Sequence, residues 1–577
     1  MKFIRRDPDK GYLDTLLWVP KNRVNVEGLK AALSPQIAPR GNTIQFLFLW
    51  KETQDHLLIP REFWELDKVD FEVIDCRPTH YTGVDIQSRI VLDVKNPEET
   101  SQKDALAALM VARGGVLQLA CGKGKTVIAL ELAARLGVPT IVVVDTTVLL
   151  KQWQNEIAKH LDVPGGVGLI KDQHLDWKKP LVMATYHTLA NRADMMPEEI
   201  RRWFGLVIWD EAHHVAAPTF CKSADLFYGR RYGLTATPIR DDGLHIVYNL
   251  HIGRVLYKNL KQDLKPRVYF KWTGFKIDGA DPITKQMTED KNGELHFGRL
   301  AGFFAKWPQR LDLILNEVNE ATKEGRKILV LSNSLDECIN LLALWNNASS
   351  LYTDVPVPTP QEVGETVSPV EIPKKKLGQM LRTLPMLNAQ LQDTSLNPVK
   401  RQHYMQQKTD FQFLLSQHEC FNKIQKVLRQ RQRDYLEKLL AQTSDAGLII
   451  QRVKPDVRDQ MIRTKAVIFA IAKYGREGLD SPMLDTVIVC EPISSRNILQ
   501  QIMGRTLRKK EGKKSPVVMF LEDDIGPMIG MCKKLRSHLL NWPVEDGGPY
   551  EYELIDHPSL KRRGNATWTT QRFAATP

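Results

Sequence analysis

Two separate stretches of the chain alternate short apolar segments with amphipathic ones, and this alternation constrains the fold more than any other feature. In residues 101–260 the apolar segments are VLQLA, TIVVVD, LVMAT, LVIWD and YGLTAT. In residues 303–545 they are KILVLS, AGLII, AVIFAI, TVIVC and VVMFLE. Apolar runs of this length, separated by helical patterns, are typical of parallel strands joined by crossover helices. The sequence therefore predicts an α/β protein with two parallel-sheet domains in tandem.

The remaining parts of the chain lack this alternation. With 577 residues the chain is too long for a single core, since domains usually contain about 100–200 residues. Residues 1–100 contain short strand-like runs and turns, which predict a small N-terminal α+β accessory domain. Residues 261–302 are expected to connect the two sheet domains, and residues 546–577 to form a polar tail.

Composition excludes several classes of protein. With 43% hydrophobic and 26% charged residues, the chain is typical of globular proteins. Its formal net charge of +12 permits a polyanionic partner such as nucleic acid without requiring one. The seven cysteines are scattered without a C-x-x-C pair, which argues against a zinc site or a disulfide framework. The chain shows neither a signal-peptide pattern nor an apolar run long enough to span a membrane, so we expect a soluble cytoplasmic protein without a membrane partner.

The second sheet domain is interrupted by an insertion at about 353–443. A stretch rich in Pro, Val and Glu, TDVPVPTPQEVGETVSPVEIP, predicts an extended linker. After it, apolar residues recur at helical spacing between about 397 and 440, with Lys and Arg at many of the other positions. Two interpretations are open: a helical hairpin that packs on its host domain, or a basic arm that contacts nucleic acid.

The stretch LACGKGKTVIALELAARLG follows an apolar strand and leads into an amphipathic helix, which is the context of a phosphate-binding loop. Gly122 and Gly124 allow backbone N–H groups to curl around phosphate oxygens, and the helix N-terminus adds partial positive charge. Lys125 is suited to reach the β- and γ-phosphates, and the Thr126 hydroxyl to bind Mg²⁺. Leu119 stands where the full G-x-x-x-x-G-K-T pattern has its first glycine. The predicted phosphate-binding residues are Gly122, Lys123, Gly124, Lys125 and Thr126.

A second candidate element is the segment FGLVIWDEAHHV, in which an apolar run ends in two acidic residues. Asp210 and Glu211 would lie at the carboxyl end of a buried strand, where open α/β sheets bind their ligands. Asp210 is suited to a Mg²⁺ contact, and Glu211 to orienting and deprotonating an attacking water. His213 and His214 are not accompanied by a third metal ligand. Together with the phosphate-binding loop, the two carboxylates predict hydrolysis of a bound nucleoside triphosphate.

With these elements in this order, the chain resembles the superfamily 2 helicases and translocases over most of the stretch from Gln102 to about Arg536. LTATP resembles motif III, AIAKYGREGLDSPMLDTVIV resembles motif V, and QQIMGRTLR fits the Q-x-x-G-R-x-x-R form of motif VI. The resemblance implies two RecA-like domains, with ATP and Mg²⁺ as ligands. It adds these site residues: Gln102 for adenine; His213, Thr235 and Thr237 for coupling hydrolysis to domain movement; Gly478 and Asp480 in motif V for binding the nucleotide; and Gln501, Arg505 and Arg508 in motif VI for catalysis.

Motif VI makes physical sense only with two domains. Arg505 and Arg508 are three residues apart and would share one face of a helix of the second domain. From there they would be aimed across the cleft at the γ-phosphate, where they would neutralise charge that develops in the transition state. Hydrolysis would therefore require closure of the cleft.

The details of the motifs resemble particular branches of the superfamily. The loop LACGKGKT is close to the P-C-G-x-G-K-T form of XPB-type helicases and of bacteriophage UvsW-type repair helicases. Ile502 and Leu507 replace an Arg and a Gly that are usual in motif VI of DEAH-box RNA helicases. The resemblance implies an ATP-dependent DNA helicase or translocase that acts on branched or forked DNA in repair or recombination, with DNA favoured over RNA and protein partners unknown.

Other functions are compatible with the same motor. An RNA helicase would use the same catalytic residues, and a motor subunit of a restriction or defence assembly would translocate on duplex DNA without separating its strands. A binding protein with an inactive motor is disfavoured, because Lys125, Asp210, Glu211 and Arg505 are all present.

Overall fold

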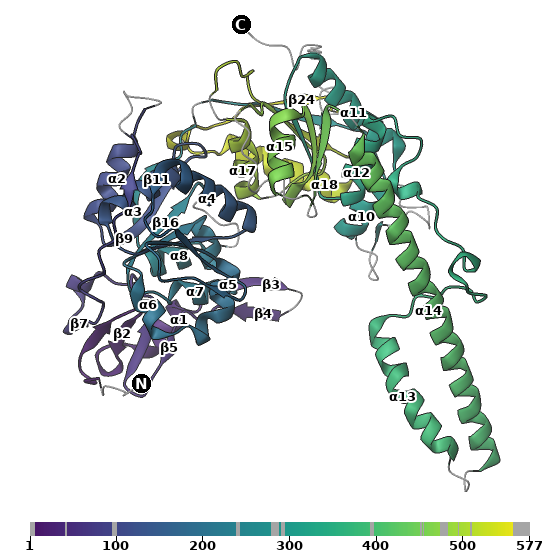
Figure 1. Ribbon diagram of the computed structural model, residues 1–577, viewed down its shortest axis with the longest axis horizontal. Helices are drawn as coiled ribbons and strands as arrows, with labels where there is room; N and C mark the ends of the chain where they lie inside the picture. The colour runs from purple at the N-terminus through teal and green to yellow at the C-terminus, as the bar shows by residue number, and fades with distance from the viewer. Residues whose placement is uncertain are drawn as a thin grey trace.

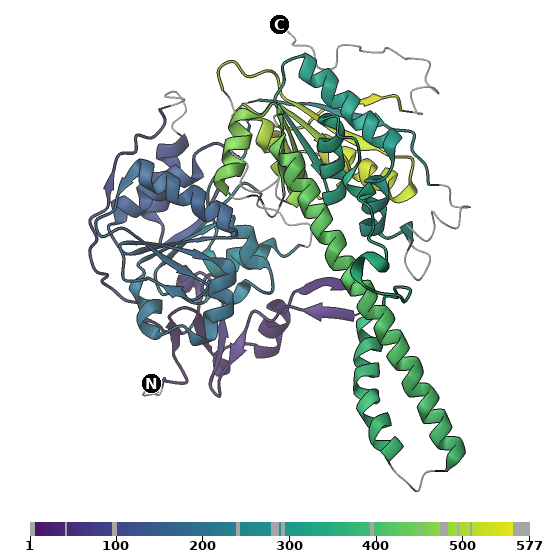
Figure 2. The same ribbon diagram turned by 45° about the vertical axis from the view of Figure 1, so that its right-hand side comes forward.

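The computed structural model shows two α/β domains side by side, with a small N-terminal domain against the first and a pair of helices that extends from the second (Figures 1 and 2). In the described ranges, no helix combines the length and the apolar character that crossing a membrane requires. All seven cysteines are free thiols. The structure describes residues 6–40, 43–94, 101–237, 243–262, 264–277, 288–289, 295–392, 397–442, 444–450, 453, 455–473, 483–493, 495–507 and 510–557.

The first α/β domain is built on an eight-stranded sheet with the order β13-β12-β14-β10-β15-β16-β9-β17. The five predicted strands form its parallel interior, because their apolar side chains are buried under helices on both faces. The other three strands are short or half-exposed and lack the continuous apolar pattern. The strands are β9 (Gly114–Leu119), β10 (Thr140–Val144), β12 (Val167–Lys171), β13 (His174–Leu175), β14 (Leu181–Thr185), β15 (Leu206–Asp210), β16 (Arg230–Thr235) and β17 (Val255–Asn259). The helices are α2 (Ser101–Val111), α3 (Lys125–Leu136), α4 (Thr147–His160), α5 (Tyr186–Arg192), α6 (Glu198–Trp203), α7 (Cys221–Ala224) and α8 (His245–Ile252).

The second α/β domain has a seven-stranded sheet with the order β20-β21-β19-β22-β23-β18-β24, and every adjacent pair in it is parallel. Two parallel sheets in tandem confirm the predicted α/β class with RecA-like domains. The strands are β18 (Arg267–Trp272), β19 (Ile328–Ser332), β20 (Ala446–Ile449), β21 (Val467–Ile471), β22 (Thr486–Val489), β23 (Val517–Glu522) and β24 (Tyr552–Ile555). The helices are α10 (Phe297–Phe304), α11 (Pro308–Lys323), α12 (Leu335–Trp345), α15 (Pro455–Thr464), α17 (Arg496–Thr506) and α18 (Gly526–Leu540).

Two segments expected to lie outside the second sheet belong to it. Residues 261–302, expected to connect the domains, contribute β18, which pairs with β23 and β24. Residues 546–577, expected to form a polar tail, contribute the edge strand β24, while residues 558–577 lie outside the described part of the chain. Both strands mix polar and apolar residues, RVYFKW and YELI, and they pair with strands distant in sequence. Local patterning therefore gives no sign of their place in the sheet.

The N-terminal domain is a mixed five-stranded sheet with the order β5-β6-β2-β1-β7. Its core is continuous with the first α/β domain, since Leu17 and Leu57 pack in one cluster with Cys221 and Val247. The buried Arg61 donates hydrogen bonds to the carbonyl oxygens of residues 228 and 229 at 3.2 and 3.0 Å, which ties the two domains together. Its elements are β1 (Gly11–Leu13), β2 (Leu17–Pro20), α1 (Val26–Ala32), a β3–β4 ribbon (Gln36–Arg40 and Thr43–Phe46), β5 (Lys51–Glu52), β6 (His56–Ile59) and β7 (Val73–Asp75); β8 (Gln87–Ser88) pairs with β11 (Leu161–Asp162).

The insertion forms a helical hairpin that projects from the second domain (Figures 1 and 2). Its two helices are α13 (Lys374–Gln392) and α14 (Pro398–Ala441). The Pro-rich stretch before α13 runs along α14, where the N–H of Val370 donates to the carbonyl oxygen of Gln417 at 3.1 Å. We call residues 353–373 the strap. The predicted extended linker is thus a segment that packs against the hairpin.

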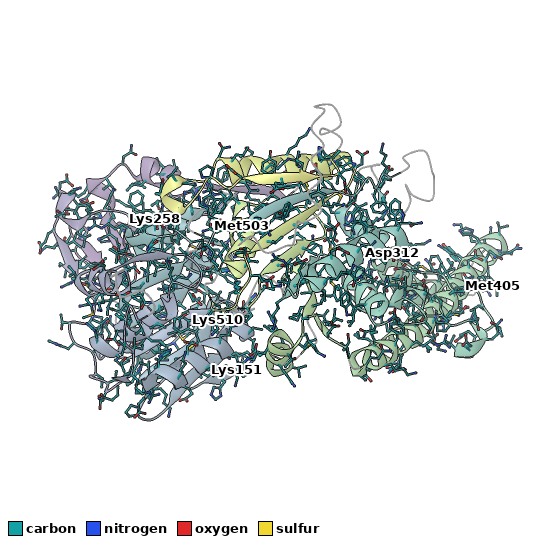
Figure 3. All side chains as sticks on the ribbon, turned by 90° about the horizontal axis from the view of Figure 1, so that it is seen from above. Lys151, Lys258, Asp312, Met405, Met503 and Lys510 are labelled. Carbon is teal, nitrogen blue, oxygen red and sulfur yellow. The ribbon has the colours of Figure 1, made fainter. Side chains whose placement is uncertain are left out.

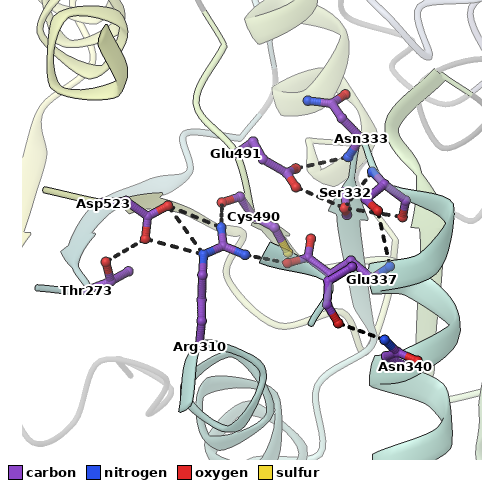
Figure 4. Close-up of polar contacts among 11 residues, drawn as sticks. Thr273, Arg310, Ser332, Asn333, Glu337, Asn340, Cys490, Glu491 and Asp523 are labelled. Atoms are coloured by element: carbon purple, nitrogen blue, oxygen red, sulfur yellow. Dashed lines mark hydrogen bonds and ion pairs between the residues drawn. The ribbon is translucent and has the colours of Figure 1, made fainter. Parts of the chain in front are cut away.

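A buried polar network holds the sheet and helices of the second domain together (Figure 4). The fully buried Arg310 of α11 forms ion pairs with Glu337 of α12 and with Asp523, which follows β23. It also donates to the carbonyl oxygen of Cys490 at 2.6 Å. Burial, together with the charge of Glu337, raises the pKa of Glu491, whose carboxylate oxygens accept hydrogen bonds from residues 332 and 333. One guanidinium therefore joins two helices to the ends of two strands.

Replacing Arg310 with Met should destabilise the second domain by about 3–5 kcal/mol, because the substitution leaves buried carboxylates without their counter-ion. Urea unfolding measures this change. Lys323→Met is the matched control on the same helix, since Lys323 pairs with Glu320 at the surface and its loss should leave unfolding unchanged within error. Equal unfolding midpoints for the two variants would contradict the structural role of Arg310.

Candidate active site at the domain interface

The predicted phosphate-binding loop connects β9 to α3 and has the backbone geometry that its glycines predict. Gly122 and Gly124 have φ values of 85° and 87°, in the left-handed region that side chains disfavour. Helix α3 begins at Lys125, so its N-terminal N–H groups and the positive end of its dipole face the loop. The Lys125 ammonium donates to the carbonyl oxygen of Leu119 at 3.0 Å, which holds it across the loop.

Gln102 lies against this loop, although it is 20 residues or more away in sequence. Its amide nitrogen donates to the carbonyl oxygen of Lys123 at 3.2 Å. A Cβ atom on Gly124 would lie 2.3 Å from the same nitrogen, so only glycine allows this approach. Asp93 secures the glutamine from the other side: its carboxylate accepts from the N–H of Gln102 at 2.9 Å, and its own N–H donates to the Gln102 side chain at 2.8 Å. No sequence motif indicates Asp93.

The two acidic residues lie at the carboxyl end of β15, as expected. Asp210 is buried and its carboxylate accepts a hydrogen bond from the indole N–H of Trp153 in α4 at 2.7 Å. Its other oxygen accepts from the N–H of Glu211 at 3.0 Å. Glu211 has φ 48°, a left-handed conformation that is strained for a non-glycine residue and turns the chain sharply after the strand. Trp153 lies on helix α4, and no sequence pattern indicates its contact with Asp210.

The environment of Asp210 shifts its titration toward neutral pH. Burial and the neighbouring charge of Glu211 raise the pKa of Asp210 to about 6, while the hydrogen bond from Trp153 and the charge of Lys125 oppose this shift. Asp210 is therefore largely ionised at pH 7 and largely protonated at pH 5.

The three residues expected to couple hydrolysis to movement form one hydrogen-bonded group. The His213 ring nitrogen Nδ1 lies 3.3 Å from the Thr235 hydroxyl and 3.2 Å from the Thr237 hydroxyl. The same ring nitrogen lies 3.5 Å from a carboxylate oxygen of Glu211. A change in the position of Glu211 can thus reach the segment after β16 through a single imidazole.

Helix α17 of the second domain contacts this site from across the interface. The side-chain amide of Gln500 donates to the carbonyl oxygen of Ala236, which lies between the two threonines, at 2.6 Å. Gly504, one turn later, faces the phosphate-binding loop, where a Cβ atom would lie 3.0 Å from the sulfur of Cys121. The sequence pattern gives Gln501 as the functional glutamine, while it is Gln500 that makes this contact between the domains.

A salt bridge joins the two domains at another place in their interface. Lys258 of β17, in the first domain, forms an ion pair at 2.9 Å with Asp546, which precedes β24 in the second domain. Seen from above, Met503 of α17 lies where the two domains meet, and Lys510 and Lys151 lie further along the same boundary (Figure 3). The interface therefore combines helix α17 with a pair of charges at the edge of the first sheet.

Four predicted residues are not described in full. Gly478, Asp480 and Arg508 lie outside the described residues, and Arg505 is placed in α17 without a described side chain. Gln501 is half-buried in the same helix. Helix α17 therefore faces the phosphate-binding loop as motif VI requires, and the arginine positions stay predictions.

The residues at the end of β15 and the start of α3 fit a Mg²⁺ ion. Asp210 is buried with a raised pKa, so a nearby cation would favour its ionised form. Thr126 is the second residue of α3, and its hydroxyl oxygen, like the Asp210 carboxylate, is the kind of ligand that Mg²⁺ prefers. The donor set is thus oxygen-only, as expected for Mg²⁺.

Comparison with known proteins gives matches to helicases over part of the chain. The family described as "Type III restriction enzyme, res subunit" (ResIII) matches residues 95–240. The chain is 35% identical over 173 residues to "DNA 3'-5' translocase XPB2" of Sulfurisphaera tokodaii, an alignment that covers 30% of this chain and 38% of that protein. It is 28% identical over 243 residues to "General transcription and DNA repair factor IIH helicase/translocase subunit XPB" of Encephalitozoon cuniculi, covering 39% and 35%.

A viral relative extends the comparison further along the chain. The chain is 26% identical over 309 residues to "Putative ATP-dependent RNA helicase L396" of Acanthamoeba polyphaga mimivirus, covering 53% of this chain and 58% of that protein. The chain spans between 35% and 58% of the lengths of these three relatives. The matches support a superfamily 2 helicase motor, and the names of the relatives include both DNA and RNA enzymes.

Proposed function

We propose that this protein is an ATP hydrolase whose two RecA-like domains couple hydrolysis to movement on DNA, as a helicase or translocase. The observation that carries this proposal is the contact of α17 with both the phosphate-binding loop and the segment after β16. Gln500 reaches Ala236, and Gly504 faces Cys121. A helix of the second domain is thus in position to respond to what the first domain binds.

In the proposed reaction, the phosphate-binding loop holds ATP in the first domain. The N–H groups between Gly122 and Thr126 donate to phosphate oxygens, and the Lys125 ammonium leaves the carbonyl oxygen of Leu119 for the β- and γ-phosphates. Lys123 is the remaining residue of the loop that is predicted to bind the phosphates. Gln102, held by Asp93 beside the loop, is suited to hydrogen-bond to the adenine.

Hydrolysis then requires a base and stabilisation of negative charge. Glu211 would take a proton from the attacking water as the bond between the γ-phosphorus and the bridging oxygen breaks, giving ADP and phosphate. Mg²⁺, held by Thr126 and Asp210, would supply positive charge next to the phosphates. From the second domain, Gln501, Arg505 and Arg508 would stabilise the charge on the transferring phosphoryl group, and Gly478 and Asp480 of motif V would bind the nucleotide.

The proposed coupling runs through the hydrogen-bonded group beside Glu211. Loss of the γ-phosphate removes contacts that favour the closed arrangement of the domains. His213 connects Glu211 to Thr235 and Thr237, and Gln500 connects that segment to α17. Repeated closure and opening would move the two domains along a nucleic-acid backbone, largely without regard to its sequence.

DNA is favoured over RNA as the substrate, because the phosphate-binding loop and motif VI resemble XPB-type and UvsW-type DNA enzymes. The name of the mimivirus relative keeps an RNA helicase as the second candidate. The name of the matching family favours a third, a translocating motor subunit of a restriction assembly that does not separate strands. Among DNA substrates we propose branched or forked structures, as in repair or recombination.

ATP hydrolysis should be stimulated most by branched DNA. Steady-state ATPase of the purified protein, measured at fixed low salt with single-stranded DNA, duplex DNA, a four-way junction and single-stranded RNA, checks this.

Lys125→Ala should lower the ATPase turnover by at least about 10²-fold, because it removes a cation from the phosphates. The control Lys159→Ala, an exposed lysine in the same domain, should behave as the unaltered protein. Strongest stimulation by RNA would favour the RNA helicase, and turnover retained by Lys125→Ala would reject the site.

Gln500→Ala should lower kcat about 3- to 10-fold, the effect of one hydrogen bond worth about 0.5–1.5 kcal/mol. The Kd for ATP in the open protein should stay unchanged, because Gln500 belongs to the other domain. Asn497→Ala, in the same helix, is the matched control. A higher Kd for ATP with an unchanged kcat would argue against a role in communication between the domains.

Trp153→Phe should shift the acidic limb of the pH profile of kcat/KM to higher pH. The indole N–H stabilises ionised Asp210, so its removal raises the pKa of Asp210 above about 6, by up to about one unit for one hydrogen bond. Activity that requires the carboxylate is then lost at a higher pH as the solution is acidified. Trp203→Phe is the control, since the Trp203 indole N–H has no partner among the described residues. An unshifted acidic limb for Trp153→Phe would show that ionisation of Asp210 does not limit the reaction.

A further inference from the structure

The hairpin of α13 and α14 carries an unusual share of the positive charge of the chain. Helix α13 contains four basic residues and no acidic one, and α14 contains nine basic residues and four acidic ones. These two helices account for most of the formal net charge of +12. The charge is therefore concentrated on one projecting element and is not spread over the surface.

The strap neutralises one side of the hairpin. Lys423 pairs with Glu365 at 2.5 Å, and Arg431 pairs with Glu362. Arg431 also donates to the carbonyl oxygen of Pro356 at 3.1 Å. These two cations are therefore used within the fold, in holding the strap against α14.

A second set of basic residues on α14 lies beside the residues that hold the strap. Lys426, Arg429 and Arg433 are separated by three and four residues, so they share one face of the helix. All three side chains are exposed, and no ion pair involves them among the described residues. The buried residues Cys420 and Ile424 lie on another side of the helix. This face is thus turned toward solvent.

The start of α13 adds three lysines beside this face. The N–H of Ile372 donates to His418 of α14 at 3.0 Å, so α13 begins two residues later next to that turn. His418 shares the face of Lys426 and lies eight residues before it, about 12 Å along the helix. Lys374, Lys375 and Lys376 are all exposed and form the first turn of α13.

These six residues form what we call the arm patch: Lys374, Lys375, Lys376, Lys426, Arg429 and Arg433. Four acidic residues lie next to it along the chain, Glu371, Glu419, Asp434 and Glu437, and Glu419 pairs with Lys423. Three lysines in the first turn of a helix repel the positive end of its dipole, and the turn contains no acidic residue that would offset this. A polyanion bound there would relieve this repulsion.

Resting on the proposed function, we propose that the arm patch binds the phosphate backbone of duplex DNA outside the motor. The patch extends over about 20 Å of α14, from the turn of His418 to Arg433, and duplex DNA carries a negative charge every ~1.7 Å along its axis. Its six members include no aromatic side chain on which unpaired bases could stack, so their chemistry suits phosphates of a paired helix better than a single strand.

The base of the hairpin determines how DNA bound to the arm patch would move. Leu439 is buried in the core of the second domain, and Tyr435 donates to the carbonyl oxygen of Ser350 at 2.5 Å. Helix α14 ends at Ala441, shortly before β20. The arm patch lies in the half of α14 nearer the domain, whereas Met405 marks the far end (Figure 3). DNA held by the patch would therefore move with the second domain when the cleft closes.

The test is equilibrium binding of the full chain, without nucleotide, to a 30-base-pair duplex over a range of salt concentrations. Replacing all six residues of the arm patch with Gln should lower affinity and reduce the slope of log K against log salt by about 3–5, as expected for loss of most of six phosphate contacts. A charge-preserving variant, Lys426→Arg with Arg429→Lys and Arg433→Lys, should keep the original slope. The control Arg382→Gln with Lys400→Gln and Lys408→Gln removes charge from the distal part of the same arm and should change the slope by less than about 1.

The outcomes separate this proposal from the proposed function. If the unaltered protein hydrolyses ATP in response to DNA but the six-residue variant keeps the full salt slope, the arm patch does not bind DNA, and an acidic protein surface becomes its better partner. An equal loss of slope on a single strand would overturn the assignment to duplex DNA. Failure of any nucleic acid to stimulate ATPase in the unaltered protein would reject the proposed function, whereas the binding measurement does not depend on hydrolysis. Circular dichroism of each variant confirms that the helices are retained.

Discussion

The strand order β15-β16-β9 in the first sheet is the constraint on which the candidate active site depends. Three neighbouring parallel strands end at one edge, so their following segments must meet there. One carries the phosphate-binding loop, one carries Asp210 and Glu211, and one carries Thr235 and Thr237. Each strand is almost entirely buried, which fixes its register and leaves the functional side chains no other place. A shift of one residue in any of the three would dismantle the site.

The second constraint is the close packing of helix α17 against the first domain. A Cβ atom on Gly504 would lie 3.0 Å from the sulfur of Cys121, which is tighter than an ordinary contact. Gln500 forms its hydrogen bond to Ala236 from the same helix. Both contacts restrict how α17 can pack against the first domain. Gly504 leaves little room for a side chain, and Gln500 needs its amide for the hydrogen bond. The same helix contains Arg505 and Gln501. The position of α17 against the first domain therefore determines where these motif VI residues lie.

Charge is distributed differently in the buried and exposed parts of the second domain. Arg310 is fully buried and balanced by several acidic groups, and it serves the packing of helices against strand ends. On the arm, Lys423 and Arg431 hold the strap, while the residues of the arm patch face solvent. The two interpretations open from the sequence, a hairpin that packs on its host and a basic arm, are therefore compatible. The base of the hairpin packs on the domain, and its outer face carries the charge.

The sequence by itself determined the α/β class, the interior strands and the contiguous motifs, because continuous apolar runs and the Gly-Lys-Thr and Asp-Glu pairs are local patterns. It did not predict β18 or β24, because both mix polar and apolar residues and their place in the sheet depends on pairing with distant strands. Nor did it give Trp153, Asp93 or Gln500, since an indole, a carboxylate and an amide become functional only through a partner that the fold brings within about 3 Å. Tertiary structure decided those contacts, because hydrogen bonds depend on distance and direction in space and leave no periodicity in the sequence.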